Sequence, residues 1–109
     1  MAWLLRRGEV LASLEIASTP AERVQQMAGR APDCNALLVR DVRSAHSLRS
    51  RRQLDVAWLD EDLVVLAVTT LSPNRLCLPR RAARHVLEAP GGAFERWHLA
   101  PGDELEVKE

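Results

Sequence analysis

The chain alternates short apolar runs with polar breaks that contain Gly, Pro, Asn or Asp, and this pattern constrains its fold more than any other feature. Short apolar runs bounded by turn residues are typical of β-strands, because ordinary helices need longer stretches. The runs lie at about residues 3–5, 10–16, 36–39, 54–59, 63–71, 83–88 and 104–107. So many short strands predict a small, curved, barrel-like sheet, partly closed and largely antiparallel.

Within this pattern the first two runs predict a β-hairpin, since Arg6-Arg7-Gly8-Glu9 between them is a short polar turn. Residues 46–50 are a further candidate strand. The 63–71 run is apolar on both faces and rich in Val and Thr, which predicts the central strand of the sheet. In the 54–59 run, period-two alternation places Leu54, Val56 and Trp58 on one face and Asp55, Ala57 and Leu59 on the other.

Helical signals are few. Thr19 as N-cap, Pro20 at the first helical position and Glu22 as a capping-box partner predict one short helix over about 19–28, which Gly29 ends. A helical turn is predicted over about 93–98, after the Pro90-Gly91-Gly92 turn. The fold class is therefore α+β, mostly β. The 109 residues suit one hydrophobic core, so we expect a single domain over 1–109.

Formal net charge is zero, which gives no global attraction to nucleic acid or to an anionic membrane. The charge is uneven, however: the chain is basic from Arg40 to Arg84 and acidic after His85, and the two parts could pair within the fold or between copies. No apolar run is long enough to cross a bilayer, and the start lacks the order of a secretory signal, so we expect a cytoplasmic protein. Whether Cys34 and Cys77 form a disulfide stays open.

The least ordinary polar chemistry lies between residues 45 and 60, directly against an apolar strand. Here His46 and Asp55 could form an acid–base pair. The alternative, which we favour, is that Asp55 anchors a loop through backbone N–H groups and His46 fills a half-buried edge position. Arg49 and Arg51 could offer guanidinium groups to a phosphate or carboxylate, or could simply protect a sheet edge.

Other chemistries have weaker signals. Arg80, Arg81 and Arg84 could extend a basic surface toward nucleic acid, but Phe94 is the single Phe, there is no Tyr, and the three Trp residues lie in apolar patterns that predict core. No metal or cofactor site is expected, because the residues that could bind one lack ligand spacing; they are Cys34, Cys77, His46, His85 and His98. Gly91-Gly92 could bind an anion at a helix N-terminus or form a plain turn.

Three segments resemble the bacterial and archaeal family called domain of unknown function 192. They are Thr19-Pro20-Ala21-Glu22-Arg23 with Gly29-Arg30; His46-Ser47, Arg51 and Leu54-Asp55-Val56 with Leu59-Asp60; and Val86-Leu87-Glu88-Ala89-Pro90-Gly91-Gly92 with Pro101-Gly102-Asp103. Leu48, Arg49, Ser50 and Gln53 depart from the family pattern, which has an aromatic residue, a Met and a Pro in this region.

The resemblance implies a small mixed β-barrel and little about activity. We therefore expect a binding or accessory module rather than an enzyme, with His46, Arg49, Arg51 and Asp55 as the contact surface and an unknown ligand or protein partner. The alternatives are a hydrolase-like enzyme that uses His46 and Asp55, and a weak nucleic-acid or anion binder that uses the arginine clusters.

Overall fold

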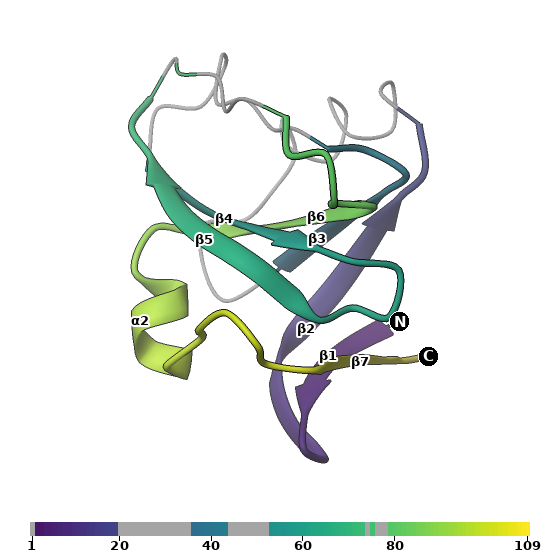
Figure 1. Cartoon of the computed structure of the whole chain (residues 1–109). Helices are drawn as coiled ribbons and strands as arrows, with labels where there is room; N and C mark the ends of the chain where they lie inside the picture. The colour runs from purple at the N-terminus through teal and green to yellow at the C-terminus, as the bar shows by residue number, and fades with distance from the viewer. Residues whose placement is uncertain (1, 20–35, 44–52, 74, 76–78) are drawn as a thin grey trace.

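The structure of the protein is a computed structural model, which describes residues 2–19, 36–43, 53–73, 75 and 79–109. The described residues form seven strands and one short helix: β1 (Ala2–Arg6), β2 (Glu9–Ala17), β3 (Ala36–Arg40), β4 (Leu54–Leu59), β5 (Val65–Leu71), β6 (His85–Pro90), α2 (Ala93–Trp97) and β7 (Leu105–Lys108) (Figure 1). The mostly-β fold class and the helical turn near 93–98 are confirmed. The predicted helix over 19–28 and the candidate strand at 46–50 lie outside the described residues, apart from Thr19.

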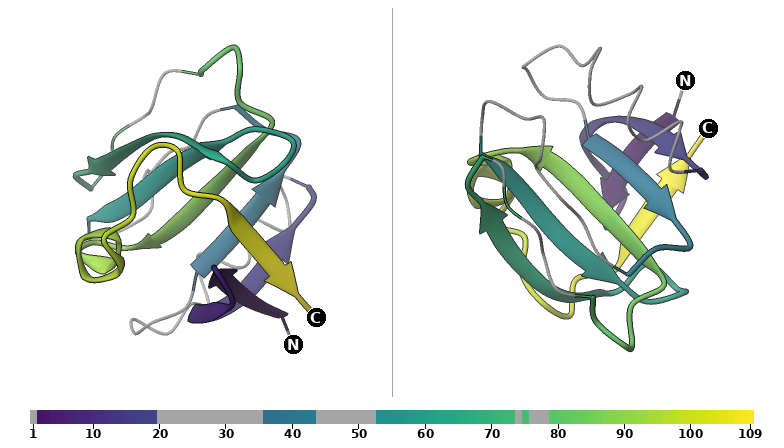
Figure 2. Two further views of the ribbon diagram at one scale, coloured as in Figure 1. Left: turned by 60° about the horizontal axis from the view of Figure 1, so that its bottom comes forward. Right: turned by 90° about the horizontal axis from the view of Figure 1, so that it is seen from above.

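All seven strands belong to one curled sheet in the order β5-β4-β6-β3-β2-β1-β7 (Figure 2). Neighbouring strands are antiparallel except β2 and β3, which run parallel, so the largely antiparallel arrangement is also confirmed. The two ends of the sheet meet at a single bridge between Val64 and Glu104. There the Val65 N–H donates to the Asp103 carbonyl at 2.9 Å and the Leu105 N–H to the Leu63 carbonyl at 3.0 Å. The sheet is therefore a half-barrel whose two edge strands are joined by hydrogen bonds at one corner.

The alternation in β4 builds two hydrophobic layers, as its sequence predicts. Ala57 and Leu59 point into the curl of the sheet and join the main core with Leu38, Leu87 and Phe94. Leu54, Val56 and Trp58 lie on the opposite face, with Val86 and Leu71. All six β4 residues are buried. This strand and its neighbour β6 are thus covered on both faces.

The predicted central strand is wrong in its position. Strand β5 lies at one end of the sheet and pairs with β4 alone among the described strands. Its side chains do pack on two sides, Val65 and Val68 against the main core and Leu66 and Leu71 against the second layer. Apolar residues on both faces of a strand indicate that both faces are covered by other parts of the protein. They do not indicate whether the strand lies at the edge of the sheet, because that depends on backbone pairing.

The predicted hairpin is confirmed, since β1 pairs with β2 in antiparallel fashion around Arg7 and Gly8, both at positive φ. Two side-chain expectations on it are wrong. Trp3, predicted to be core, is 40% exposed, because Ala2 and Leu4 on either side of it take the buried face of β1. Period-two alternation in the 10–16 run predicts one face for Val10, Ala12, Leu14 and Ile16, but Val10 is 55% exposed, where the pairing of β1 with β2 shifts register beside the turn.

Candidate functional site

Asp55 is the one member of the predicted contact surface that the structure describes, and it is an internal anchor. Its side chain is 3% exposed and points into the curl of the sheet. Oδ1 accepts a hydrogen bond from the Thr70 hydroxyl on neighbouring β5 at 2.9 Å. Oδ2 accepts from the backbone N–H groups of Gly92 at 3.0 Å and Phe94 at 2.9 Å. This arrangement is the loop anchoring by Asp55 that the sequence favours over an acid–base pair.

The same contacts account for the Gly91-Gly92 turn. Gly92, at φ 93°, is the N-cap residue of α2 and has no capping side chain of its own. The Asp55 carboxylate binds the first N–H groups of the helix from a distant strand instead. A helix N-terminus favours an anion through its orphan donors and its dipole. The anion at this turn is therefore supplied by the chain itself.

The remaining predicted site residues, His46, Arg49 and Arg51, lie outside the described residues, as do Arg52, Cys34 and Cys77. The acid–base pairing of His46 with Asp55 and the disulfide therefore stay predictions. The described residues that flank the 44–52 segment are both fixed to the sheet. The Arg43 carbonyl accepts a hydrogen bond from the Trp58 indole, and the Gln53 carbonyl accepts one from the Gly91 N–H at 3.0 Å.

Five exposed arginines gather where β3 ends and β6 begins, and we call them the arginine cluster: Arg40, Arg43, Arg80, Arg81 and Arg84. The Arg43 carbonyl accepts from the Trp58 Nε1–H at 2.9 Å and from the Arg80 N–H at 3.1 Å. The Arg43 Nε donates to the Ala83 carbonyl at 3.2 Å, and the Arg80 guanidinium lies 4.6 Å from the centre of the Trp58 ring. Trp58 is core, as predicted, and is also the platform that orders two of these arginines.

His85 lies among the same side chains. It pairs in register with Arg40 across β3 and β6, and its Nδ1 accepts a hydrogen bond from the Asp41 N–H at 3.2 Å. Burial lowers the pKa of His85 below its ordinary value of 6.5, with Arg40 and Arg84 acting in the same direction and Asp41 and Asp60 opposing them. The imidazole is therefore a neutral acceptor at pH 7, and the positive charge of this surface comes from the arginines.

Sequence reasoning grouped Arg80, Arg81 and Arg84 but did not join Arg40 and Arg43 to them. The available signal was that Arg40 and Arg43 directly follow the apolar run at 36–39. The sequence does not show which end of a neighbouring strand lies beside the end of this run, because that depends on how the strands pair. Antiparallel pairing of β3 with β6 places the last residue of one strand beside the first residue of the other, which brings Arg40 to His85 and Arg84.

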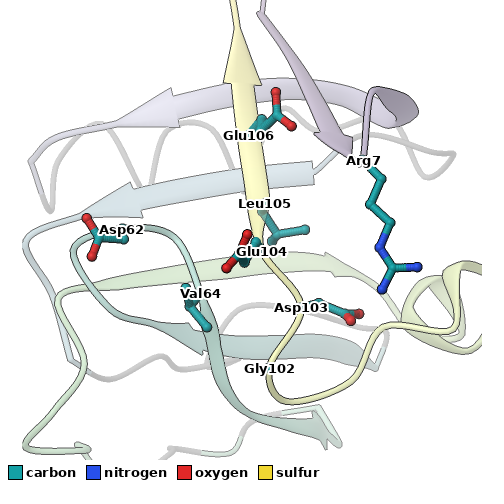
Figure 3. Close-up of a pocket in the computed structure, with 8 residues that line it drawn as sticks. All are labelled: Arg7, Asp62, Val64, Gly102, Asp103, Glu104, Leu105 and Glu106. Carbon is teal, nitrogen blue, oxygen red and sulfur yellow. The ribbon is translucent and has the colours of Figure 1, made fainter.

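An acidic hollow of about 670 Å³ lies near the corner where β5 and β7 meet (Figure 3). Its charged lining consists of Arg7 and four carboxylates, those of Asp62, Asp103, Glu104 and Glu106. Asp103 accepts from the Ala100 N–H and forms an ion pair with Arg6 at 2.9 Å. The Ala100 N–H and Arg6 hold the pKa of Asp103 below its ordinary value of 3.8. The acidic end of the chain is evident in the sequence, but only the fold brings these residues together.

Two further carboxylates lie on the covered outer face of the sheet. Register places Glu15, Leu37 and Glu88 in one row across β2, β3 and β6. Glu88 is fully buried and has an interaction partner. The Oε2 atom of Glu15 is buried and has no hydrogen-bond partner among the described residues. The chain therefore keeps acidic groups on a face that is otherwise mainly apolar, where burial of a charge is costly.

Within the part of the chain that the structure describes, no cluster of three or more His, Cys, Asp or Glu side chains is placed to hold a metal ion. In the same residues, no helix has the length and apolar character needed to cross a membrane.

Curated relatives of the chain are archaeal proteins of the group named UPF0127. The chain is 36% identical over 63 residues to the UPF0127 protein PF1050 of Pyrococcus furiosus, which is 58% of this chain and 54% of the relative. It is 36% identical over 61 residues to the UPF0127 protein PYRAB11210 of Pyrococcus abyssi, covering 56% of this chain and 52% of that protein. The match thus spans about half of the length of these relatives.

Two solved structures share the fold. A protein of Sinorhizobium meliloti 1021, named as a candidate transcription regulator, superposes with a TM-score of 0.76 and 22% identity over 97% of this chain and 91% of that one. A Novosphingobium aromaticivorans protein of unknown function gives a TM-score of 0.75 and 21% identity over 96% of this chain and 82% of that chain. The family model of the uncharacterised ACR proteins called DUF192 matches residues 3–107. The chain therefore belongs to the DUF192 family, as its three sequence segments indicated.

Proposed function

We propose that the protein is a small binding module that recognises an anionic group, a phosphate or a carboxylate, through the arginine cluster. The observation that carries this proposal is that five exposed arginines gather where β3 ends and β6 begins. Asp41 and Asp60 lie close enough to this surface to act on His85, but the five arginines outnumber them. Guanidinium groups in excess over nearby carboxylates are well suited to bind planar or tetrahedral oxyanions through paired hydrogen bonds.

Preorganisation supports the same proposal. A guanidinium held over an aromatic ring loses less side-chain freedom on binding than a free surface arginine. Arg80 is held over Trp58, and Arg43 is fixed through its Nε and its carbonyl. Both arginines are therefore set by the rigid strand β4, and the outer nitrogens of Arg43 face no described partner.

His46, Arg49 and Arg51 follow Arg43 along the chain, and we propose that they extend this contact surface. Asp55 would support it indirectly, since its carboxylate is buried and binds α2. The same contacts weigh against the hydrolase alternative. A general base needs to lie within reach of substrate, whereas Asp55 is 3% exposed and its carboxylate is held by three hydrogen bonds in the interior.

The test is an NMR titration of the ¹⁵N-labelled protein with pyrophosphate, followed at the backbone amides of β3 and β6 and the indole N–H of Trp58. We expect saturable shifts at the arginine cluster, and at least about tenfold weaker binding in Arg40→Gln/Arg84→Gln, since each lost charge-assisted contact is worth about that factor. The matched control is Arg96→Gln, which removes a charge from exposed Arg96 of α2. Equal weakening in the control, or no saturable shift, would overturn the proposal.

A second titration with a short single-stranded oligonucleotide separates the sources of phosphate. A nucleic-acid ligand would bind more tightly than pyrophosphate, with an affinity that falls steeply and log-linearly with salt. Zero net charge and the lack of exposed stacking residues among the described arginine neighbours favour the small anion or an acidic protein segment.

A further inference from the structure

Strand β7 ends the sheet, and its outer edge is open beyond the corner bridge. On its inner side β7 pairs with β1 from Trp3–Lys108 to Arg6–Leu105. On its outer side the Leu105 N–H donates to the Leu63 carbonyl. Backbone groups of an antiparallel strand alternate in direction, so the N–H and C=O of Val107 point to the same outer side as the Leu105 N–H. Among the described residues, no strand pairs with this edge after Leu105.

The side chains of β7 alternate as well. Glu104 and Glu106 are exposed on one face, while Leu105 is buried and Val107 is partly buried against the main core together with Leu63. A strand added to this edge would continue the same alternation. Its residues on the outer face would lie beside Glu104 and Glu106, and those on the inner face beside Val107 and Leu63.

Charge determines which added strand fits. The acidic hollow lies along this edge, with the carboxylates of Asp62, Glu104 and Glu106 around it (Figure 3). Asp103 is paired with Arg6 and is close enough to Arg7 for that charge to lower its pKa. After Arg7 and Lys108 are counted, the exposed carboxylates of Asp62, Glu104 and Glu106 still give this edge a net negative charge. An incoming strand with positive side chains would be favoured, and an acidic one would be repelled.

We propose that the outer edge of β7 and the acidic hollow form a docking site for an extended basic segment of a partner protein, bound by strand addition. Main-chain hydrogen bonds to the Leu105 C=O and to the N–H and C=O of Val107 would give affinity, and pairs with Glu104 and Glu106 would give selectivity for Lys or Arg at alternate positions. A second copy is the alternative occupant of this edge, because antiparallel pairing could set Lys108 of one copy opposite Glu104 or Glu106 of the other, and the test below separates it from a basic partner segment. This site is separate from the arginine cluster and opposite in charge.

The test uses a capped peptide of alternating Lys and Val, titrated into the ¹⁵N-labelled full chain. We expect saturable shifts at the amides of residues 104–108, with the Val107 amide moving downfield as it gains a hydrogen bond. The double variant Glu104→Gln/Glu106→Gln should bind about tenfold more weakly and with less dependence on salt. The control Glu95→Gln removes a charge from exposed Glu95 of α2 and should leave affinity unchanged.

Two further peptides decide the binding mode. The same sequence with N-methylated Val residues keeps the charge but loses main-chain donors, so it should fail to bind. Equal binding of this peptide would mean that charge by itself explains the binding, and would overturn strand addition. An alternating Glu and Val peptide should not shift residues 104–108. The docking site would be refuted by any of three results. These are shifts from either control peptide equal to those of the first peptide, dimerisation without peptide, and no saturable binding. Pyrophosphate binding in Glu104→Gln/Glu106→Gln should match wild type, which keeps this result independent of the arginine cluster.

Discussion

At the scale of single residues, Asp55 shows how a polar residue inside a hydrophobic strand can be structural. Its carboxylate joins three elements, since it lies on β4, accepts from Thr70 on β5 and accepts from the first backbone N–H groups of α2. Charge-assisted hydrogen bonds of this kind are stronger than neutral ones. Removing a buried acceptor also leaves its donors unsatisfied, which adds to the cost.

We predict that Asp55→Asn lowers the free energy of unfolding by about 1 kcal/mol and Asp55→Ala by about 2–3 kcal/mol. The amide can still accept from α2 while donating to Thr70, so Asn loses mainly the charge. For a domain of this size 1 kcal/mol corresponds to a fall of about 4–8 °C in the unfolding midpoint. Calorimetry measures both variants against Glu61→Gln, which removes a charge from an exposed turn. An unchanged midpoint in Asp55→Ala would refute the anchor and reopen the catalytic alternative.

Asp103 gives a pH-dependent prediction. The pKa of its carboxyl is below 3.8 in the folded protein, chiefly because of the Ala100 N–H and also because of Arg6. A lowered folded pKa stabilises the protein above pH 3.8, and this contribution is lost as pH falls through the folded pKa. The side chain is 19% exposed and the ion pair lies near the surface, so we expect a small effect.

The unfolding midpoint of Asp103→Asn should therefore be roughly 2–6 °C below that of wild type at pH 7. The difference should begin to shrink below pH 3.8, where the carboxyl of the unfolded chain becomes protonated, and should disappear once the pH has fallen through the lower pKa of the folded protein. A difference that stays constant from pH 7 to pH 3 would mean that the variant acts through packing, and would contradict the electrostatic account.

At the scale of elements, the turn between β6 and α2 is fixed by close approach as well as by Asp55. The Gly91 N–H donates to the Gln53 carbonyl at 3.0 Å, just before β4 begins. A Cβ at position 91 would lie 2.9 Å from the Gln53 Cβ and 3.1 Å from its carbonyl oxygen. The chain thus passes so near to Gln53 that only glycine fits without movement.

We predict that Gly91→Ala costs about 1–3 kcal/mol through this overlap, and that α2 shifts with it. Gly8→Ala is the matched control: Gly8 has φ 77° and open space around its Cβ position, so its cost of about 1 kcal/mol comes from backbone conformation alone. Chemical denaturation compares the two. A smaller loss in Gly91→Ala than in Gly8→Ala would contradict the overlap.

At the scale of the whole molecule, the sheet is a half-barrel with a well-covered middle and two ends that meet at one corner. Strands β3, β4 and β6 lie inside the sheet and are almost wholly buried, whereas β5 and β7 are its terminal strands. Opposite charges are gathered on two separate surfaces, the arginine cluster and the acidic hollow.

Hydrogen exchange should report this arrangement. We predict the slowest backbone exchange in β4 and β6, faster exchange in the outer half of β5, and the fastest strand exchange in β7 beyond Leu105, because exposed edges open without breaking the core. Exchange measured by NMR at several pH values checks the order. If the β7 amides were as protected as those of β6, the edge would be covered, which would also count against the docking site proposed for it.

The sequence by itself determined the local structure. Most of the described strands and the helical turn could be predicted from the alternation in β2 and β4, the Arg7-Gly8 turn and the Pro90-Gly91-Gly92 break. Side-chain period and turn chemistry depend on residues that are near in sequence. The family could also be recognised, from Leu54-Asp55-Val56 and the segments on either side of it.

Tertiary structure alone decided which strand lies at the edge, what Asp55 binds and which charges meet. Strand β5 has the composition of a central strand but lies at the end of the sheet. Asp55 reaches α2 across 37 residues of sequence, and the pairing of β3 with β6 sets Arg40 opposite His85, the residue after Arg84. Long-range backbone pairing produces each of these contacts, and pairing depends on the register and order of distant strands, which no short stretch of sequence encodes.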